Sequence, residues 1–102
     1  MHIEGTRFQC AGYNVRLHCA QYGNGRLAIQ VICDDGEPYG NLTVNLPDGP
    51  LGAGEMFIKT WGGNEELVGC ALATGLFINT DRPIVTGWTT AETWKLVKGV
   101  EI

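Results

Sequence analysis

The sequence has 102 residues, of which 44% are hydrophobic, 9% aromatic and 18% charged. These proportions are typical of a compact globular domain, and they exclude a disordered, collagen-like or membrane-spanning chain. Eleven acidic and seven basic side chains give a net charge of -4, the wrong sign for a general binder of nucleic acid or anionic membranes. We therefore expect a single domain over residues 1–102 whose partner is neither nucleic acid nor a membrane.

The N-terminal residues and the cysteines predict the compartment. Residues 1–5 lack the basic region and the apolar run of a secretory signal, and no later segment has the apolar length of a membrane helix. No Cys-x-x-Cys pair occurs among the cysteines at positions 10, 19, 33 and 70, so neither a zinc site nor a thioredoxin-like redox site is indicated. We expect a cytoplasmic protein with reduced, mostly buried thiols, whose folding needs neither a disulfide nor a metal.

The first half of the chain predicts an antiparallel meander of three strands. Apolar and polar side chains alternate over 13–22, which is typical of a half-buried strand. The turn residues 23–25 separate it from 27–33, a β-branched run suited to an interior strand, so these two strands should form a hairpin. After a second turn at 34–36, alternation over 41–46 predicts the third strand.

The second half predicts a loop, a strand and one helix. Residues 47–54 contain three glycines and two prolines in eight positions, which is typical of a loop. A strand is expected over 56–61. A helix over about 64–74 should follow, with Asn64 as its N-cap and Gly75 as its C-terminal stop.

Residues 84–97 are rich in β-branched and aromatic side chains. They predict either one long strand, kinked near Gly87 or Ala91, or two short strands. The expected fold class is therefore α+β, with a five- or six-stranded, mostly antiparallel sheet and one helix packed on it. The sheet could be open or curled into a half-barrel.

The sequence carries no motif that predicts a cofactor, a metal site or a catalytic residue. Neither a phosphate-binding loop nor a dinucleotide-binding glycine motif is present. His18 adjoins Cys19, but neighbouring residues of a strand face opposite sides and cannot pair as nucleophile and base. The same geometry disfavours a metal site that combines His18 with the cysteines. The acidic turn 34–37 lacks the ligand spacing of a calcium loop.

Aromatic side chains predict a binding surface in the C-terminal half. If the strand over 56–61 alternates, Phe57, Lys59 and Trp61 form an exposed stripe, and the intervening side chains belong to the core. Trp88 lies in another segment rich in threonine. Exposed aromatic residues often anchor protein interfaces, so we expect these four residues to bind a partner. In the alternative, the helix covers Trp61, Trp88 and Trp94 as core.

Acidic side chains add to this predicted surface. Residues 34–66 contain seven acids and one lysine, a sum of -6, and Asp34, Asp35 and Glu37 share one turn. Such a surface could imitate nucleic acid toward a protein that binds it, or only keep the domain soluble. We include the three turn residues among the candidate binding residues.

Turn and strand signatures occur in the segments 25–31, 35–48, 57–61, 64–65, 74–77 and 83–88. In these segments the chain resembles a bacterial and phage family of short proteins, the domain of unknown function numbered 4313. Because these segments are turn and strand signatures, the resemblance bears on the fold more than on activity. It implies cargo of phages and conjugative elements in gut bacteria, and it supplies no catalytic residue.

From these observations we expect a small, non-enzymatic, cytoplasmic binding module. In its most specific form, it is an accessory protein of a phage or mobile element that inhibits host defence by binding an immune protein. The alternative is a small-ligand-binding or hydrolytic domain in which His18, Arg16, Asn45 and Arg82 converge in a cleft. A third possibility is a homodimer that forms through an open edge strand.

Overall fold

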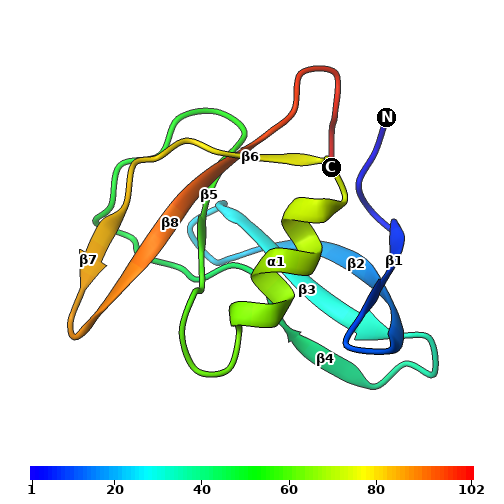
Figure 1. Cartoon of the computed structure of the whole chain (residues 1–102). Coiled ribbons are helices and arrows are strands. Elements are labelled where there is room, and N and C mark those ends of the chain that lie inside the picture. The colour runs from blue at the N-terminus through cyan, green and yellow to red at the C-terminus, as the bar shows by residue number, and fades with distance from the viewer.

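The computed structural model describes residues 1–102 and contains eight strands and one helix (Figure 1). In chain order the elements are β1 (Arg7–Cys10), β2 (Tyr13–Gln21), β3 (Leu27–Cys33), β4 (Pro38–Asn41), β5 (Glu55–Ile58), α1 (Glu65–Ala73), β6 (Phe77–Asn79), β7 (Ile84–Thr86) and β8 (Thr89–Leu96). The predicted α+β class, antiparallel pairing and single helix are confirmed. The prediction of one sheet with five or six strands is wrong, because the strands form two sheets of four. Neither sheet is curled into a half-barrel.

The first sheet has the strand order β1-β2-β3-β4, so neighbours in the chain are also neighbours in the sheet. The predicted hairpin of β2 and β3 is confirmed, with the buried Leu17 opposite the buried Val31. β1 is an addition to the predicted meander and pairs antiparallel with β2. Its turn, Ala11 and Gly12, has φ values of 52° and 83°, as a two-residue hairpin turn of type I′ requires.

The third strand of the meander lies closer to the N-terminus than predicted. The expected strand over 41–46 is wrong in position, because β4 ends at Asn41. Pro38 opens β4, and a proline is tolerated there because β4 is an edge strand of the first sheet.

Segment 42–44 connects the two sheets through its backbone. The Leu42 N–H donates to the Ile29 carbonyl of β3 at 2.9 Å. The next residue, Thr43, forms a bridge with Ile58 of β5 instead. The chain therefore passes from the first sheet to the second between two successive residues, Leu42 and Thr43.

The second sheet is built around β8. β5 and β6 pair with opposite edges of β8, and β7 pairs with its first three residues. Of the two alternatives for residues 84–97, two strands are therefore correct, with the turn between them at Gly87 and Trp88.

The predicted helix is confirmed as α1, and it is too short to cross a membrane; no helix of the structure meets that length and hydropathy. Gly75, with φ of 76°, follows the helix as expected. Asn64 precedes it, but its side chain does not cap the helix. The Asn64 amide donates instead to the carbonyl oxygens of Asn41 and Lys59, both at 2.8 Å, and so ties the start of α1 to β4.

The core lies where the two sheets and α1 meet. Fourteen buried residues form one cluster, to which β1, β2 and β3 contribute from the first sheet and β5, β6 and β8 from the second. Trp94 of β8 is completely buried in it, and its ring packs on Phe77 with the centroids 5.6 Å apart. Leu67 and Ala71 are the buried residues of α1.

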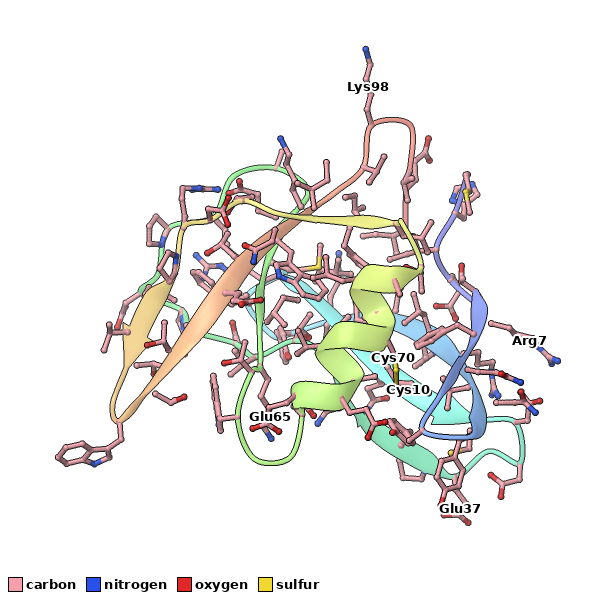
Figure 2. All side chains as sticks on the ribbon, in the orientation of Figure 1. Arg7, Cys10, Glu37, Glu65, Cys70 and Lys98 are labelled. Carbon is pink, nitrogen blue, oxygen red and sulfur yellow. A yellow bond between two sulfur atoms is a disulfide. The ribbon has the colours of Figure 1, made fainter.

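Two of the four cysteines form a disulfide. Cys10 of β1 and Cys70 of α1 are bonded, with their Cα atoms 5.7 Å apart (Figure 2). The expectation of reduced thiols is wrong for this pair, because the unpredicted strand β1 lies alongside α1. Cys19 and Cys33 are free and half-buried. Since disulfides persist mainly in oxidising compartments, the oxidation state of this pair in cells tests the predicted cytoplasmic location.

Candidate functional site

Phe57 is buried, so the predicted exposed stripe of Phe57, Lys59 and Trp61 is wrong at its first residue. The side chain is only 2% exposed, although it faces away from the main core cluster. The loop before β5 covers this second face: Gly49 lies against the ring, and the Arg26 guanidinium carbon is 5.9 Å from the ring centroid. A long-range contact therefore buries a residue that strand alternation alone would expose.

Trp88 is completely exposed, with a relative exposure of 105%. It is the second residue of the turn between Thr86 and Thr89 and follows Gly87, whose φ is 60°. This is the pattern of a type II′ hairpin turn, in which glycine supplies the positive φ of the first position. The turn lies at one end of the molecule (Figure 1). Val85, in β7, is 76% exposed and adds apolar surface beside it.

Trp61 and Lys59 lie close to this hairpin and are half-buried. The hydroxyl of Thr60, between them, donates to the Thr90 carbonyl of β8 at 2.6 Å. This bond fixes the loop after β5 against the middle of the β7–β8 hairpin, one residue pair from its turn. Because Trp94 is in the core, the three tryptophans have three different environments, and neither predicted alternative holds for all of them.

The acidic turn lies at the opposite end of the molecule from the hairpin (Figure 1). Asp34, Asp35 and Glu37 are exposed between β3 and β4. Asp34 lies 3.9 Å from the Arg7 guanidinium, and Asp35 accepts a hydrogen bond from the Glu37 N–H at 3.0 Å. The aromatic and acidic candidates therefore do not form one continuous surface.

The polar residues of the alternative prediction do not converge in a cleft. They are His18, Arg16, Asn45 and Arg82. His18 and Arg16 lie on β2 of the first sheet, whereas Arg82 forms an ion pair with Glu55 of the second. Asn45 accepts a hydrogen bond from the Asn24 amide at 3.1 Å. The four residues thus lie in three separate parts of the fold, and only His18 and Arg16 share an element.

Glu4, His18 and Cys19 form a small cluster of titratable groups. The Glu4 carboxylate accepts a hydrogen bond from the Cys19 backbone N–H at 2.5 Å and lies 3.1 Å from His18 Nδ1. The backbone hydrogen bond, aided by His18, lowers the pKa of Glu4. Burial, together with the negative charge of Glu4, raises the pKa of Cys19 to about 12. Because the thiolate is the nucleophilic form, this environment does not activate Cys19 near neutral pH.

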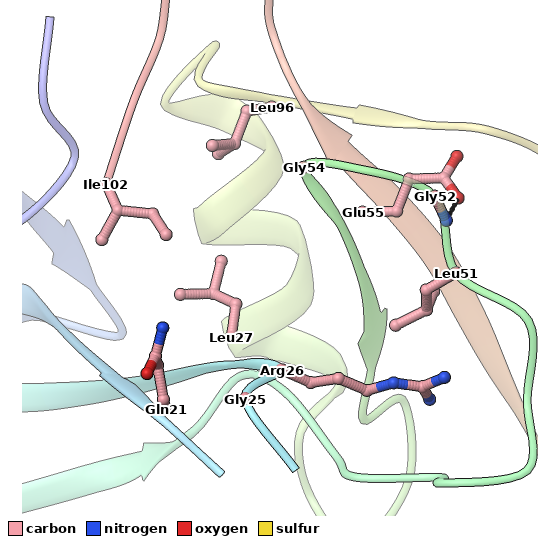
Figure 3. A pocket seen from close by; sticks show the side chains of 10 residues that line it. All are labelled: Gln21, Gly25, Arg26, Leu27, Leu51, Gly52, Gly54, Glu55, Leu96 and Ile102. Atoms are coloured by element: carbon pink, nitrogen blue, oxygen red, sulfur yellow. Dashed lines mark hydrogen bonds between the residues drawn. The ribbon is translucent and has the colours of Figure 1, made fainter.

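A pocket of about 280 Å³ lies between the β2–β3 turn, the loop before β5 and the C-terminal residues (Figure 3). The Arg26 guanidinium donates to the carbonyls of Leu46 and Gly49, both at 2.7 Å. Glu55 accepts a hydrogen bond from the Gly52 N–H at 2.7 Å. Both charged groups thus bind the loop that bounds the pocket. No group of three or more His, Cys, Asp or Glu side chains is arranged to hold a metal ion.

Comparison with known proteins adds no family to this description. No family model, no curated protein and no solved structure matches the chain. The resemblance to the domain of unknown function 4313 therefore stays a prediction based on the segments that carry it.

Proposed function

We propose that this protein is a non-enzymatic binding module that engages a protein partner through its β7–β8 hairpin, with Trp88 as the anchor. The observation that supports this proposal is the complete exposure of Trp88 at the hairpin tip. Tryptophan is among the residues that contribute most to binding at protein interfaces. Because Trp88 is completely exposed, its transfer to a partner's pocket removes apolar surface from water without first breaking buried contacts in its own fold.

The hairpin is well suited to present this side chain. A two-residue turn leaves the backbone little freedom, and the bond from Thr60 to Thr90 holds the hairpin one residue pair from that turn. Little conformational entropy is then lost when the tip binds. The exposed Val85 extends the apolar contact area, and the half-buried Trp61 lies on the neighbouring loop.

A more specific form of the proposal rests on the family resemblance. In that form the partner is an immune protein of the host, and this chain is the counter-defence inhibitor of a phage or mobile element. The exposed acidic turn would be a second, separate contact, suited to a partner with a basic surface.

The test is affinity capture from a bacterial lysate with matched baits. The wild-type protein is compared with Trp88→Ser and with Tyr13→Ser, which removes an aromatic side chain, 57% exposed, far from the hairpin. We expect one stoichiometric partner that the wild type and Tyr13→Ser retain and that Trp88→Ser loses. Equal capture by all three baits would refute a role for Trp88.

Self-association is the competing explanation for an exposed apolar tip. Light scattering at high concentration separates the two. We expect the mass of a monomer, near 11.1 kDa. A dimer that Trp88→Ser converts to a monomer would show that the hairpin pairs with a second copy of this chain instead.

A further inference from the structure

The outer edge of β1 has backbone groups that no strand of this chain uses. In the hairpin of β1 and β2, Cys10 and Tyr13 flank the two-residue turn and form a hydrogen-bonded pair. In the next pair, Gln9 and Asn14, the backbone N–H and C=O groups must then point away from each other. The bond from the Asp34 N–H to the Asn14 carbonyl, toward β3, agrees with this alternation. The N–H and C=O of Gln9 therefore point outward, and those of Arg7 do the same.

This edge faces a groove along α1. The groove has a volume of about 540 Å³, and Phe8 and Gln9 line it from β1. Gly69 and Ala73 line it from α1, one helical turn apart. A Cβ atom added to Gly69 would meet nothing within 4 Å, so the small residues of α1 leave this space open.

One end of the groove is closed and acidic. The disulfide holds the Cα atoms of Cys10 and Cys70 5.7 Å apart, which leaves no room for a strand between them. Glu66 lines the groove at this end, where its carbonyl lies 3.8 Å from Cys10 Sγ. Its carboxylate is exposed and has no basic side chain within 4.0 Å, so it is free to pair with a cation.

We propose that this groove binds an extended, basic peptide segment of a partner protein, which adds as a strand to the edge of β1. The backbone of Gln9 and Arg7 would supply the hydrogen bonds, and small apolar side chains of the peptide would lie on Gly69 and Ala73. A lysine or arginine of the peptide would pair with Glu66. This site lies at the opposite end of the molecule from Trp88 and does not depend on the function proposed for the hairpin.

The probe is an acetylated eight-residue peptide with lysine at its first position, valine at the third, fifth and seventh, and threonine between them, so that the lysine and the valines share one face of the strand. It is added to isotope-labelled protein and followed by NMR. We expect the amide signals of Gln9 and Gly69 to shift, and exchange of the Gln9 amide proton to slow by about tenfold as it enters a hydrogen bond. Two control peptides test whether binding depends on the positive charge and on the backbone hydrogen bonds. One has glutamate in place of lysine, and the other has N-methylated backbone amides; both should bind at least about tenfold more weakly.

Gly69→Leu fills the groove without a clash in the free protein, because leucine favours a helix and the space is open. We expect this variant to keep or raise its melting temperature and to weaken peptide binding by about tenfold or more. Gly23→Leu adds the same side chain in open space at the β2–β3 turn and should bind as the wild type does. Ala73→Leu replaces Gly69→Leu if the latter does not fold.

Three results would overturn the proposal. They are an unshifted Gln9 amide signal with the lysine peptide, equal binding of the N-methylated control peptide, and unchanged peptide binding by Gly69→Leu. Trp88→Ser should bind the peptide normally. The proposal for the groove and the proposal for the hairpin can therefore be supported or refuted independently.

Discussion

Gly49 lies directly against the ring of Phe57, so that a Cβ atom at position 49 would be 2.5 Å from the Phe57 Cζ atom. Real atoms do not approach this closely, and either the ring or the loop has to move to admit a methyl group. Phe57 is buried by this contact, which is why it cannot belong to an exposed binding stripe.

Gly49→Ala is therefore expected to destabilise the protein by about 1–3 kcal/mol, the usual cost of overpacking. Urea unfolding measures the change. Gly69→Ala is the matched control, because its new methyl group has free space in α1, and it should stabilise the protein by up to about 1 kcal/mol. Equal effects of the two substitutions would contradict the contact.

Trp88 and Trp94 should differ in both fluorescence and stability. Trp88→Phe removes an emission component that is red-shifted and readily quenched by acrylamide, whereas Trp94→Phe removes a blue-shifted, protected one. Trp88→Ser should change the free energy of unfolding by about 0.5 kcal/mol or less. Trp94→Ala should cost about 3–5 kcal/mol, because it leaves a cavity in the core. A protected Trp88 signal would remove the basis of the proposed function.

The disulfide should contribute strongly to stability. It joins residues 60 positions apart, and closure of a loop of that length stabilises a protein by about 4 kcal/mol in the chain-entropy model. Cys10→Ala combined with Cys70→Ala, or a reducing agent, should lower the urea midpoint accordingly. Cys19→Ala combined with Cys33→Ala is the control, since neither residue is bonded.

Thiol trapping in intact cells tests the compartment. Two protected sulfurs per molecule would indicate an oxidising location and contradict the cytoplasmic prediction. Four free thiols would agree with that prediction and show that the bond is absent in the cell.

Acid should lower the free energy of unfolding, partly because it protonates Glu4. Its pKa is lower in the folded protein than its ordinary value of 4.5, chiefly because the Cys19 backbone N–H bonds the carboxylate. This contribution is complete above pH 4.5 and is lost as the pH falls through the folded value. In urea titrations from neutral pH to pH 3, the stability advantage of the wild type over Glu4→Gln should shrink below that point. A difference that stays constant with pH would show that Glu4 does not act through its charge.

The parts of the fold that the sequence predicted well depend on local patterns. Alternation over 13–22 and the turn at 23–25 define the β2–β3 hairpin. Asn64 and Gly75 bracket α1. These signals lie within a few neighbouring residues, so no knowledge of the rest of the fold is needed to interpret them.

The errors have non-local causes. Phe57 is buried by a loop that precedes it, and no residue pattern within β5 indicates that this loop covers its side chain. Cysteine spacing does not determine which cysteines pair, so the partner of Cys10 depends on the position of β1 beside α1. β1 itself has four residues, too few for alternation to distinguish it from a loop.

One site signal was present in the sequence but was not used. Gly87 followed by Trp88, with threonines on both sides, matches the glycine-first turn of a two-residue hairpin. This pattern alone would have put Trp88 at a tip. By contrast, the groove beside Gly69 depends on β1 and could not be predicted without it.

Segment 42–44 makes each sheet an incomplete folding unit. Loss of the first sheet would remove the partner of Leu42, and loss of the second would remove the partner of Thr43. Opening of either sheet then exposes the shared core, so a partly unfolded state that keeps only one sheet is not stable. Amide protons of β3 and β5 should accordingly exchange through the same global opening, with equal free energies, rather than as two separate cooperative units.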